Sequence, residues 1–458
     1  MNLNNLEMQK STKPPRQARR LIFFSFIILV FGFTNLKAQS YIGHAVDNYS
    51  GIHSVIYNPA NIVSSNLRAD VNIVSASGLI DNDYLAINIS DLIESPDDFD
   101  FDKASAESPS NRNNFFFNAD VVGPSFMFNL NKKSSIGIIS RARGIFSLND
   151  INGKLYQNVV DGFEADTDFD FNSPDLVGTM HVWAEIGLSY GRILMTKPNH
   201  LLTGGVTLKY LQGAGSLYIN TPGLSGQYTA ANETLQSQGS LNYGTTQGFD
   251  NNDIDFSNLT AGFGLDVGFT YEYHPKRDND DIRYFQDPYK FKVGLSVTDI
   301  GSINYNNATV TSYDLNDTVS TATWQDDVEE FLENNYENTA SGQSVALQLP
   351  TVLHLLLDYR LTKKILISAQ GNFGLTDSEN ALSSRMTNTL TLSPRFETKW
   401  FSAYIPLSLR QYGGFVFGGG FRLGPLTVGS GSIFSNLISD TSKTADVFVG
   451  LKIPLYRK

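Results

Sequence analysis

The chain has 458 residues, a formal net charge of −12 at pH 7 and no cysteine. Without cysteine it can form no disulfide framework, no thiolate metal site and no lipid-modified N-terminal cysteine. The acidic balance argues against a nucleic-acid partner, and the abundance of glycine (38), phenylalanine (31) and tyrosine (21) favours β-structure.

Residues 1–38 have the three parts of a secretory signal peptide. A basic segment precedes an apolar run at 21–33, and Ala38 is the small residue at the exit. Because the run is shorter than the roughly 20 residues of a membrane-spanning helix, we expect cleavage after Ala38; an uncleaved anchor is the alternative. Residues 39–67 follow and are small, polar and too irregular for a strand.

The region 68–458 shows the period of two that is typical of β-strands. At 259–273 one parity is apolar, whereas the other carries only glycine, threonine, aspartate and glutamate. Segments of this kind have the length of about 10 residues that crosses hydrocarbon at a tilt. The polar parity is then expected to face a lumen and the apolar parity to face lipid.

Fourteen such segments predict an all-β fold, a transmembrane antiparallel up-and-down β-barrel. They span residues 68–90, 115–130, 134–147, 178–193, 200–218, 258–274, 290–305, 347–360, 363–375, 387–399, 402–411, 414–423, 425–434 and 445–456. Long connections mostly alternate with short ones, as external loops and periplasmic turns do in outer-membrane barrels. A hairpin at 78–83 would raise the count, so sixteen strands stay possible.

If these strand phases hold, a set of charged side chains points into the lumen. The set is Arg141, Arg143, Glu185, Lys209, Asp266, Glu272, Lys292, Asp358, Arg360, Glu397, Arg410, Arg422 and Lys452. One interpretation is a network of salt bridges that fills and stiffens the interior. The other is a selectivity surface that lines a channel.

Gly123 and Pro124 interrupt the predicted strand 115–130. Proline cannot donate to a β-ladder, so the interruption is either a bulge near one rim or a lateral opening towards lipid.

No metal or cofactor is predicted. The six histidines lie far apart, and Asp166, Asp168 and Asp170 begin like a calcium loop but lack its glycine and its closing glutamate. The chain has no nucleophile elbow and no phosphate loop. We therefore expect no enzyme activity, although a barrel can assemble a Ser-His-Asp site from distant strands.

Asn58, Pro59 and Ala60 lie just ahead of the first predicted strand. In this tripeptide, its position and the strand count, the chain resembles the FadL-like outer-membrane barrels, the long-chain fatty-acid transport family. The resemblance implies that residues 39–67 form a plug inside a barrel of residues 68–458. Barrels of this kind also serve type 9 secretion and gliding machinery, which implies a possible protein partner.

A closer resemblance covers nearly the whole chain after the leader. GGVTLKYLQG (204–213), FRLGPLTVGS (421–430) and ADVFVGLKIPL (445–455) resemble an uncharacterised family of Bacteroidota outer-membrane barrels, a domain of unknown function. The resemblance to that family implies no activity. The last stretch also resembles the C-terminal signal that the barrel-assembly machinery reads, although Arg457 and Lys458 follow the aromatic Tyr456.

The sequence thus predicts an outer-membrane barrel that passes a small hydrophobic molecule without a cofactor. The expected route leads past the plug near Asn58, with lateral exit near Gly123 and Pro124. The alternative is a barrel that conducts nothing and docks a secretion, gliding or surface protein through its loops. Membrane lipids and the barrel-assembly machinery are the remaining expected partners.

Overall fold

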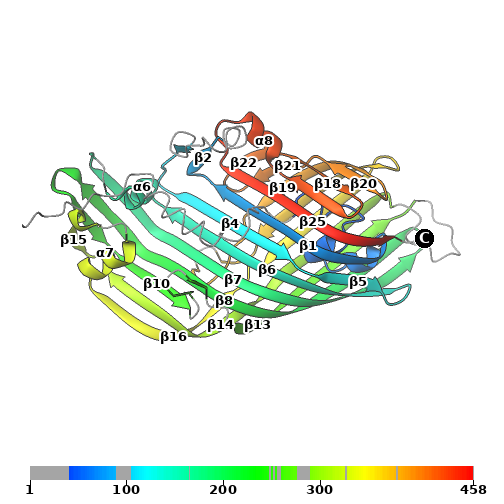
Figure 1. Ribbon diagram of the computed structural model, residues 1–458, viewed down its shortest axis with the longest axis horizontal. Coiled ribbons are helices and arrows are strands. Elements are labelled where there is room, and N and C mark those ends of the chain that lie inside the picture. Colours follow the sequence, from blue (N-terminus) through cyan, green and yellow to red (C-terminus); the bar gives the residue numbers. More distant parts are fainter. Residues whose placement is uncertain are drawn as a thin grey trace, which may run out of the picture.

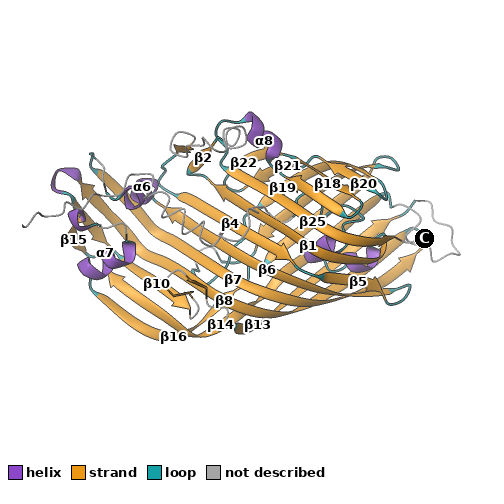
Figure 2. Cartoon of the chain, in the orientation of Figure 1, coloured by secondary structure: helices purple, strands orange, loops and turns teal. Residues whose placement is uncertain are grey.

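The structure is a computed structural model that describes residues 41–88, 105–163, 166–246, 249–250, 253–254, 259–275, 289–324, 327–377 and 380–456. The expected signal peptide lies outside these residues. Nearly all elements are strands, and every pairing in the main sheet is antiparallel (Figures 1 and 2). No helix among the described residues is long and apolar enough to cross a membrane.

The main sheet closes into a ring of fourteen strands. In chain order the ring consists of β1 (Leu67–Asn82), β4 (Asn113–Val122) with β5 (Ser125–Asn129), β6 (Ser134–Ile151), β7 (Phe169–Lys197), β8 (His200–Thr229), β13 (Thr260–Tyr273), β14 (Phe291–Asp314), β16 (Asn338–Gln348) with β17 (Val352–Arg360), β18 (Ile365–Gly374), β19 (Thr389–Glu397), β20 (Phe401–Tyr404) with β21 (Leu407–Arg410), β22 (Gly414–Phe417) with β23 (Gly419–Leu423), β24 (Leu426–Ser430) and β25 (Thr444–Tyr456). β25 pairs with β1 and closes the ring.

The predicted fold class is confirmed, and the count is fourteen. β1 continues to Asn82 in register with β4 and β25, so the alternative hairpin at 78–83 is wrong. The predicted C-terminal ends of two strands are also wrong. The first ring strand stops at Asn82 instead of residue 90, and the strand predicted for 425–434 ends at Ser430, before a helix.

The two faces of the wall differ as the alternation predicts. On β13 the buried, inward side chains include Asp266, Thr270 and Glu272, whereas the outward Phe263 and Phe269 are 72% and 46% exposed. Large exposed apolar side chains recur on the outward face around the ring. A wall of this kind would leave a wide apolar surface in water, so it suits hydrocarbon surroundings.

We call the end of the barrel at which β1 begins and β25 finishes the turn end, and the opposite end the loop end. Short connections such as 130–133, 361–364 and 398–400 join strands at the turn end. The remaining strands, β2 (Leu85–Ile87), β3 (Ser105–Glu107), β9 (Thr234–Gln238), β10 (Ser240–Thr246), β11 (Phe249–Asp250), β12 (Asp253–Ile254) and β15 (Asp317–Ser320), belong to the loop-end connections.

At the loop end part of the wall continues as an extension beyond the ring (Figure 1, left). It consists of the outer parts of β7, β8 and β14, with β9, β10, β15, β16, α6 (Gly153–Asp161), α7 (Val328–Asn335) and the 3₁₀ turns Ala230–Asn232 and Thr321–Thr323. These elements enclose an apolar cluster that includes Phe169, Tyr228 and Phe331. Burial, with nearby Glu329, raises the pKa of Tyr243 to about 12 in the same region. The extension explains why β7, β8 and β14 are longer than their predicted strands.

Candidate functional site

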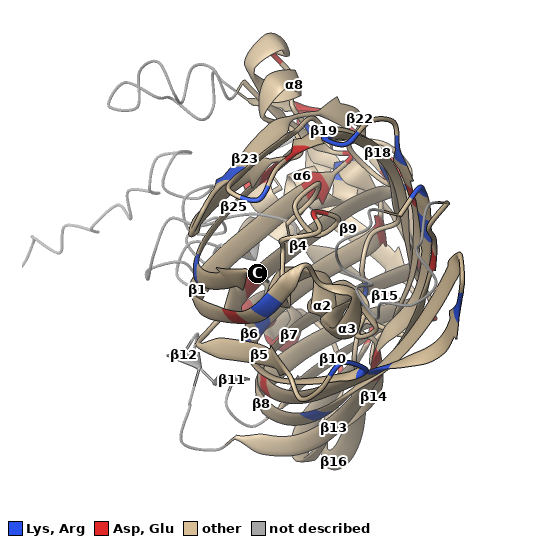
Figure 3. Cartoon of the chain, turned by 90° about the vertical axis from the view of Figure 1, so that its right-hand side faces the viewer, with Lys and Arg blue, Asp and Glu red and all other residues tan. Residues whose placement is uncertain are grey.

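The N-terminal segment 41–66 lies inside the ring at the turn end. It contains α2 (Ile52–Tyr57) and α3 (Asn61–Ser64), and the view along the barrel shows both helices surrounded by strands (Figure 3). Most of its side chains are buried, including the polar His44, Asp47 and His53. We call this segment the plug, since it occupies the lumen where the sequence predicted one.

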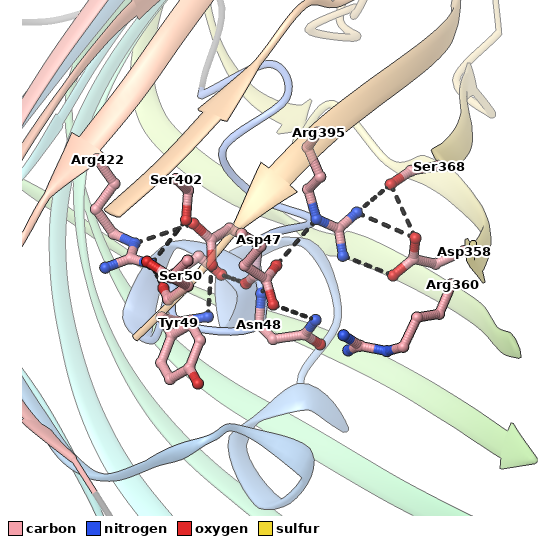
Figure 4. Close-up of polar contacts among 12 residues, drawn as sticks. Asp47, Asn48, Tyr49, Ser50, Asp358, Arg360, Ser368, Arg395, Ser402 and Arg422 are labelled. Carbon is pink, nitrogen blue, oxygen red and sulfur yellow. Dashed lines mark hydrogen bonds and ion pairs between the residues drawn. The ribbon is translucent and has the colours of Figure 1, made fainter. Parts of the chain in front are cut away.

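Charged residues of the wall hold the plug through direct contacts (Figure 4). Arg422 donates from Nε to Oδ2 of Asp47 at 2.9 Å, and both side chains are fully buried. Lys452 donates from Nζ to the carbonyl oxygens of Tyr49 and Ser50 at 2.6 and 2.8 Å. Two predicted luminal cations are therefore plug anchors.

Asn48 of the plug is bound by a second group of wall residues. Its Nδ2 donates to Oε1 of Glu397 at 2.8 Å, and its backbone N–H donates to Oε2 at 3.1 Å. Arg395 donates to the same glutamate and holds Asp358 with two hydrogen bonds of 3.1 and 2.7 Å. Arg360 is half-buried and lies over the ring of Tyr289, whose hydroxyl donates to Asp358.

The tripeptide Asn58, Pro59 and Ala60 packs against glycines of the wall. Asn58 accepts from the backbone N–H of Ala60 at 2.9 Å and donates to the carbonyl oxygen of Phe269 at 3.0 Å. A Cβ atom at Gly268 would lie 2.2 Å from Oδ1 of Asn58. The inward glycine thus gives the motif the room to reach the backbone of β13.

Further along the lumen, three cations and four carboxylates form a charge belt across β4, β6, β7, β8, β13 and β14. The belt consists of Arg141, Arg143, Lys209, Asp120, Glu185, Asp266 and Asp299, all buried. Arg141 binds Asp120 through two hydrogen bonds of 2.7 and 2.6 Å. Arg143 reaches Asp299 at 2.7 Å, and Lys209 reaches Asp266 at 2.8 Å. Each cation is therefore paired, as the network interpretation expects.

The other predicted luminal charges are also buried and paired. Lys292 lies 3.6 Å from Glu272, and Arg410 forms an ion pair with Asp446. The prediction missed Asp47, Asp70, Asp120, Asp299, Arg395 and Asp446. Arg395 has the same parity as Glu397 on β19, so the alternation could have identified it. Asp47 lies in the plug, where no strand phase applies.

Beyond the charge belt, the inward face turns apolar towards the loop end. Buried side chains there form one cluster, which consists of Leu79, Phe116, Ile145, Val177, Trp183, Leu211, Tyr218, Ile303, Tyr305, Ala308, Val310, Val345, Leu347, Leu349 and Ala381. Seven strands contribute to it, and five of them, β4, β6, β7, β8 and β14, do so through the parity that carries the charges of the belt. This apolar section of the lumen was not predicted, because the inward face of a transmembrane barrel is expected to be polar.

A connection from the loop end folds into the apolar section. Residues 380–387, which we call the inserted segment, follow β18, and Ala381, Ser383 and Ser384 are buried. Thr179 on β7 donates to the carbonyl oxygen of Ala381 at 2.7 Å, and Nδ1 of His181 lies 3.0 Å from Oγ of Ser384. The plug and the inserted segment therefore both occupy the lumen, one at the turn end and the other in the apolar section.

The interruption at Gly123 and Pro124 separates β4 from β5. Side chains cross it: Asn72 donates from Nδ2 to the carbonyl oxygens of Val122 and Gly123 at 3.0 Å, and Ser140 donates from Oγ to that of Pro124 at 2.9 Å. These hydrogen bonds close the wall here in this conformation. Lateral exit at this point stays a prediction.

A second interruption of the wall lies on the loop-end side of the short strand β24, which ends at Ser430. Beyond it, β25 and β22 have no strand between them among the described residues, and α8 (Ile433–Ile438) covers the interval. Asp446 accepts from the backbone N–H of Gly431 at 2.6 Å and from Oγ of Ser432 at 2.8 Å. The helix turns Phe434, Leu437 and Ile438 outward, with 40%, 47% and 75% exposure.

A small pocket separates the plug from the wall at the turn end. Its lining consists of Ala45, Val46, Asp47, Asn48, Ser54, Asn61, Ser64, Ser65, Lys292 and Leu356. In this pocket, polar plug residues and the wall cation Lys292 border the same open space.

The sequence matches the model of a protein family described as "Family of unknown function (DUF5723)" over residues 59–431. No curated protein matches it. Among solved structures, the toluene transporter TbuX of Ralstonia pickettii is similar, with 10% identity, coverage of 92% of this chain and 100% of that chain, and a TM-score of 0.46. A Pseudomonas aeruginosa FadL homologue has 11% identity, coverage of 92% and 98%, and a TM-score of 0.40. The Pseudomonas putida toluene transporter TodX has 10% identity, coverage of 91% and 97%, and a TM-score of 0.39. At these values the likeness carries no inference about function.

Proposed function

Since the chain belongs to the DUF5723 family, whose function is unknown, we propose from its geometry that it is a passive outer-membrane channel for a small hydrophobic molecule. The observation that carries the proposal is the apolar section of the lumen, enclosed between the inserted segment and the plug. A channel for polar solutes gains nothing from an apolar interior, because it would strip the solute of water without offering hydrogen bonds.

The proposed orientation places the turn end in the periplasm and the loop end outside the cell. Short turns on one side and long connections on the other support this choice. A cleaved signal peptide at 1–38 and insertion by the barrel-assembly machinery belong to the same proposal, with membrane lipids around the exposed apolar wall.

In the proposed path, a hydrophobic molecule displaces the inserted segment and rests in the apolar section. The charge belt and the plug block its further passage until the plug shifts near Asn58. No covalent step and no cofactor is part of this path.

The proposal also includes exit of the molecule through the barrel wall into lipid. Two interruptions of the wall are candidate exit sites. Replacing Pro124 by alanine tests the first. If uptake of a hydrocarbon is unchanged in Pro124→Ala, exit at Gly123 and Pro124 is excluded. The interval covered by α8 is then the remaining candidate, since side-chain contacts with Asp446 and Ser435 hold it in place of a continuous ladder.

The rival proposal is a barrel that conducts nothing and docks a secretion, gliding or surface protein. The observation that favours it is the filled lumen, in which the charges of the belt are all paired. It predicts a stoichiometric partner protein that stays bound during purification in mild detergent, and it predicts no flux.

Uptake by cells that carry the barrel in a lipopolysaccharide-containing outer membrane separates the two. With toluene as the hydrophobic probe and glucose as the polar one, the channel proposal predicts faster toluene uptake than in cells without the barrel and no effect on glucose. Replacing Trp183, which lies in the apolar section, by glutamate is expected to slow toluene flux. Equal uptake with and without the barrel would contradict the channel proposal.

A further inference from the structure

The extension ends on one side in a strand whose outer edge is open. β16 pairs with β14 along one edge, from Gln348 opposite Ser302 to Asn338 opposite Tyr313. On its other edge, only Gln348 has a pairing partner among the described residues, an isolated bridge to Ser383. β18, the next strand of the ring, pairs with β17 and ends at Gly374, opposite Val352.

The open edge stands outside the apolar belt of the barrel. On β14 the exposed side chains Val293, Leu295 and Ile300 are apolar, but the exposed residues farther out, such as Asn304 and Asn306, are polar. β16 pairs with this outer, polar part of β14. Every residue of 338–344 is exposed, on both faces of the strand, so no other part of the described chain covers it.

β16 lacks most of the protection that exposed strand edges usually carry. Natural edge strands are blocked by lysine, proline, inward charges or bulges, and here the one such device is a bulge in β14, between Tyr305 and Ala308. The eleven residues Asn338–Gln348 include no charged residue and no proline. An uncharged open edge offers unpaired backbone N–H and C=O groups to a second extended chain.

The charge around this edge indicates which kind of polypeptide can bind to it. No lysine or arginine occurs in 210–275 or in 293–359, the stretches that supply β9, β10, β15, α7, β16 and the outer parts of β8 and β14. The same stretches carry exposed carboxylates, among them Asp317, Glu333 and Glu337. A second copy of this chain would bring the same negative charge to the edge, so like-charge repulsion disfavours a β16 to β16 dimer.

We propose that β16 is a docking edge on which an extended, basic segment of another protein adds as a further β-strand. The segment pairs with residues 338–344, over about 23 Å at 3.3 Å per residue, and its lysine or arginine side chains lie near the carboxylates of the extension. This role is independent of the proposed channel, since the edge lies outside the lumen.

Because the chain has no cysteine, single introduced thiols can locate the contact. The probe is a synthetic nine-residue peptide of alternating lysine and valine with one terminal cysteine. Ser341→Cys places a thiol on the open edge, and Gln236→Cys is the matched control. Gln236 is exposed in the same extension, but its strand β9 is paired with β8 on one side and β15 on the other. The proposal predicts disulfide cross-linking at Ser341→Cys at least about tenfold above that at Gln236→Cys, equivalent to about 1.4 kcal/mol.

Proline variants test whether the backbone makes the contact. N–H groups of neighbouring strand residues point to opposite edges, so one of Ala340→Pro and Ser341→Pro removes a donor from the open edge and leaves the ladder to β14 intact. The variant that retains the wild-type melting behaviour is expected to lose peptide binding about tenfold. Unchanged binding in the variants that fold would overturn strand addition.

Two further results would also overturn the proposal. Equal binding of a peptide with glutamate in place of lysine would contradict a basic partner. A dimer of the purified chain that disappears in the folded proline variant would show that a second copy occupies the edge.

Discussion

At the residue scale, buried ion pairs decide how firmly the plug is held. Asp47 and Arg422 are both fully buried, so neither charge has water as an alternative partner. The surface pair of Arg112 and Asp175 has nearly the same separation, 3.1 Å, but its side chains are 59% and 52% exposed. The two pairs therefore differ mainly in burial.

Asp47→Asn is expected to weaken the docking of the plug by about 3–5 kcal/mol, because Arg422 keeps its charge and loses its carboxylate. The measurement is the rate at which a protease added to the barrel in detergent cuts residues 41–66. Asp175→Asn serves as the control and is expected to cost about 0–1 kcal/mol. Equal protection in both variants would show that the ion pair does not hold the plug.

Gly268→Ala is expected to displace the tripeptide at Asn58, since the new Cβ would lie 2.2 Å from Oδ1 of Asn58. Overpacking of this kind costs about 1–3 kcal/mol, and the expected result is a lower melting temperature of the plug with an intact barrel. Gly342→Ala is the matched control, as a Cβ there meets nothing within 4 Å. A wild-type melting curve for Gly268→Ala would contradict the close packing of the motif.

At the element scale, two short segments replace strand pairing with side-chain contacts. The inserted segment closes the apolar section, and α8 covers the interval above β24. α8 has reversed amphipathicity for a helix in water, since Asn436 is buried and Ile438 is 75% exposed. Neither segment contributes a strand to the ring.

Replacing 381–384 by four glycine and serine residues is expected to open the apolar section. The replacement removes the contacts to Thr179 and His181, so barrel-dependent toluene uptake by cells should rise several-fold. The same replacement of 230–233, a turn at the same end, keeps the length change equal and should leave flux unchanged. Equal flux in the two variants would remove the inserted segment from the path.

Asp446→Asn is expected to loosen α8, because Asp446 binds Gly431, Ser432 and Arg410 at once. Hydrogen exchange of the amides of 431–438 should become faster, while exchange in β1 and β25 stays slow. Asp440→Asn, which changes an exposed carboxylate beside the same helix, should leave exchange unchanged. Slow exchange in both variants would show that Asp446 does not hold α8 in place.

At the scale of the whole molecule, most of the fold could be predicted from the alternation of polar and apolar side chains. The alternation predicted fourteen ring strands, with sixteen left open by the hairpin alternative at 78–83. It also predicted the inward direction of charges such as Lys209 and Asp266, because a one-residue slip would turn them into lipid. It failed where a strand leaves the apolar belt, as at β8, which continues to Thr229 in the extension. It also failed at 431–434, where Phe434 belongs to a helix that exposes its apolar side.

The candidate site could be predicted only in part. The tripeptide at Asn58 and the luminal charges follow from position and parity, but their partners do not. Asp47 meets Arg422 across 375 residues of sequence, and Asn48 meets Glu397 across 349. The apolar section depends on a connection that folds back into the lumen, which strand periodicity cannot show.

The most direct test of the central claim is toluene flux through a barrel whose plug can be locked. In Asn58→Cys with Gly268→Cys, the ideal Cβ of residue 268 lies 2.9 Å from the position of Asn58 Cγ, close enough for a disulfide. We predict that oxidation abolishes the barrel-dependent part of toluene uptake by cells and that reduction restores it, while neither single variant responds. Equal flux in the oxidised and reduced protein would contradict a channel gated by its plug.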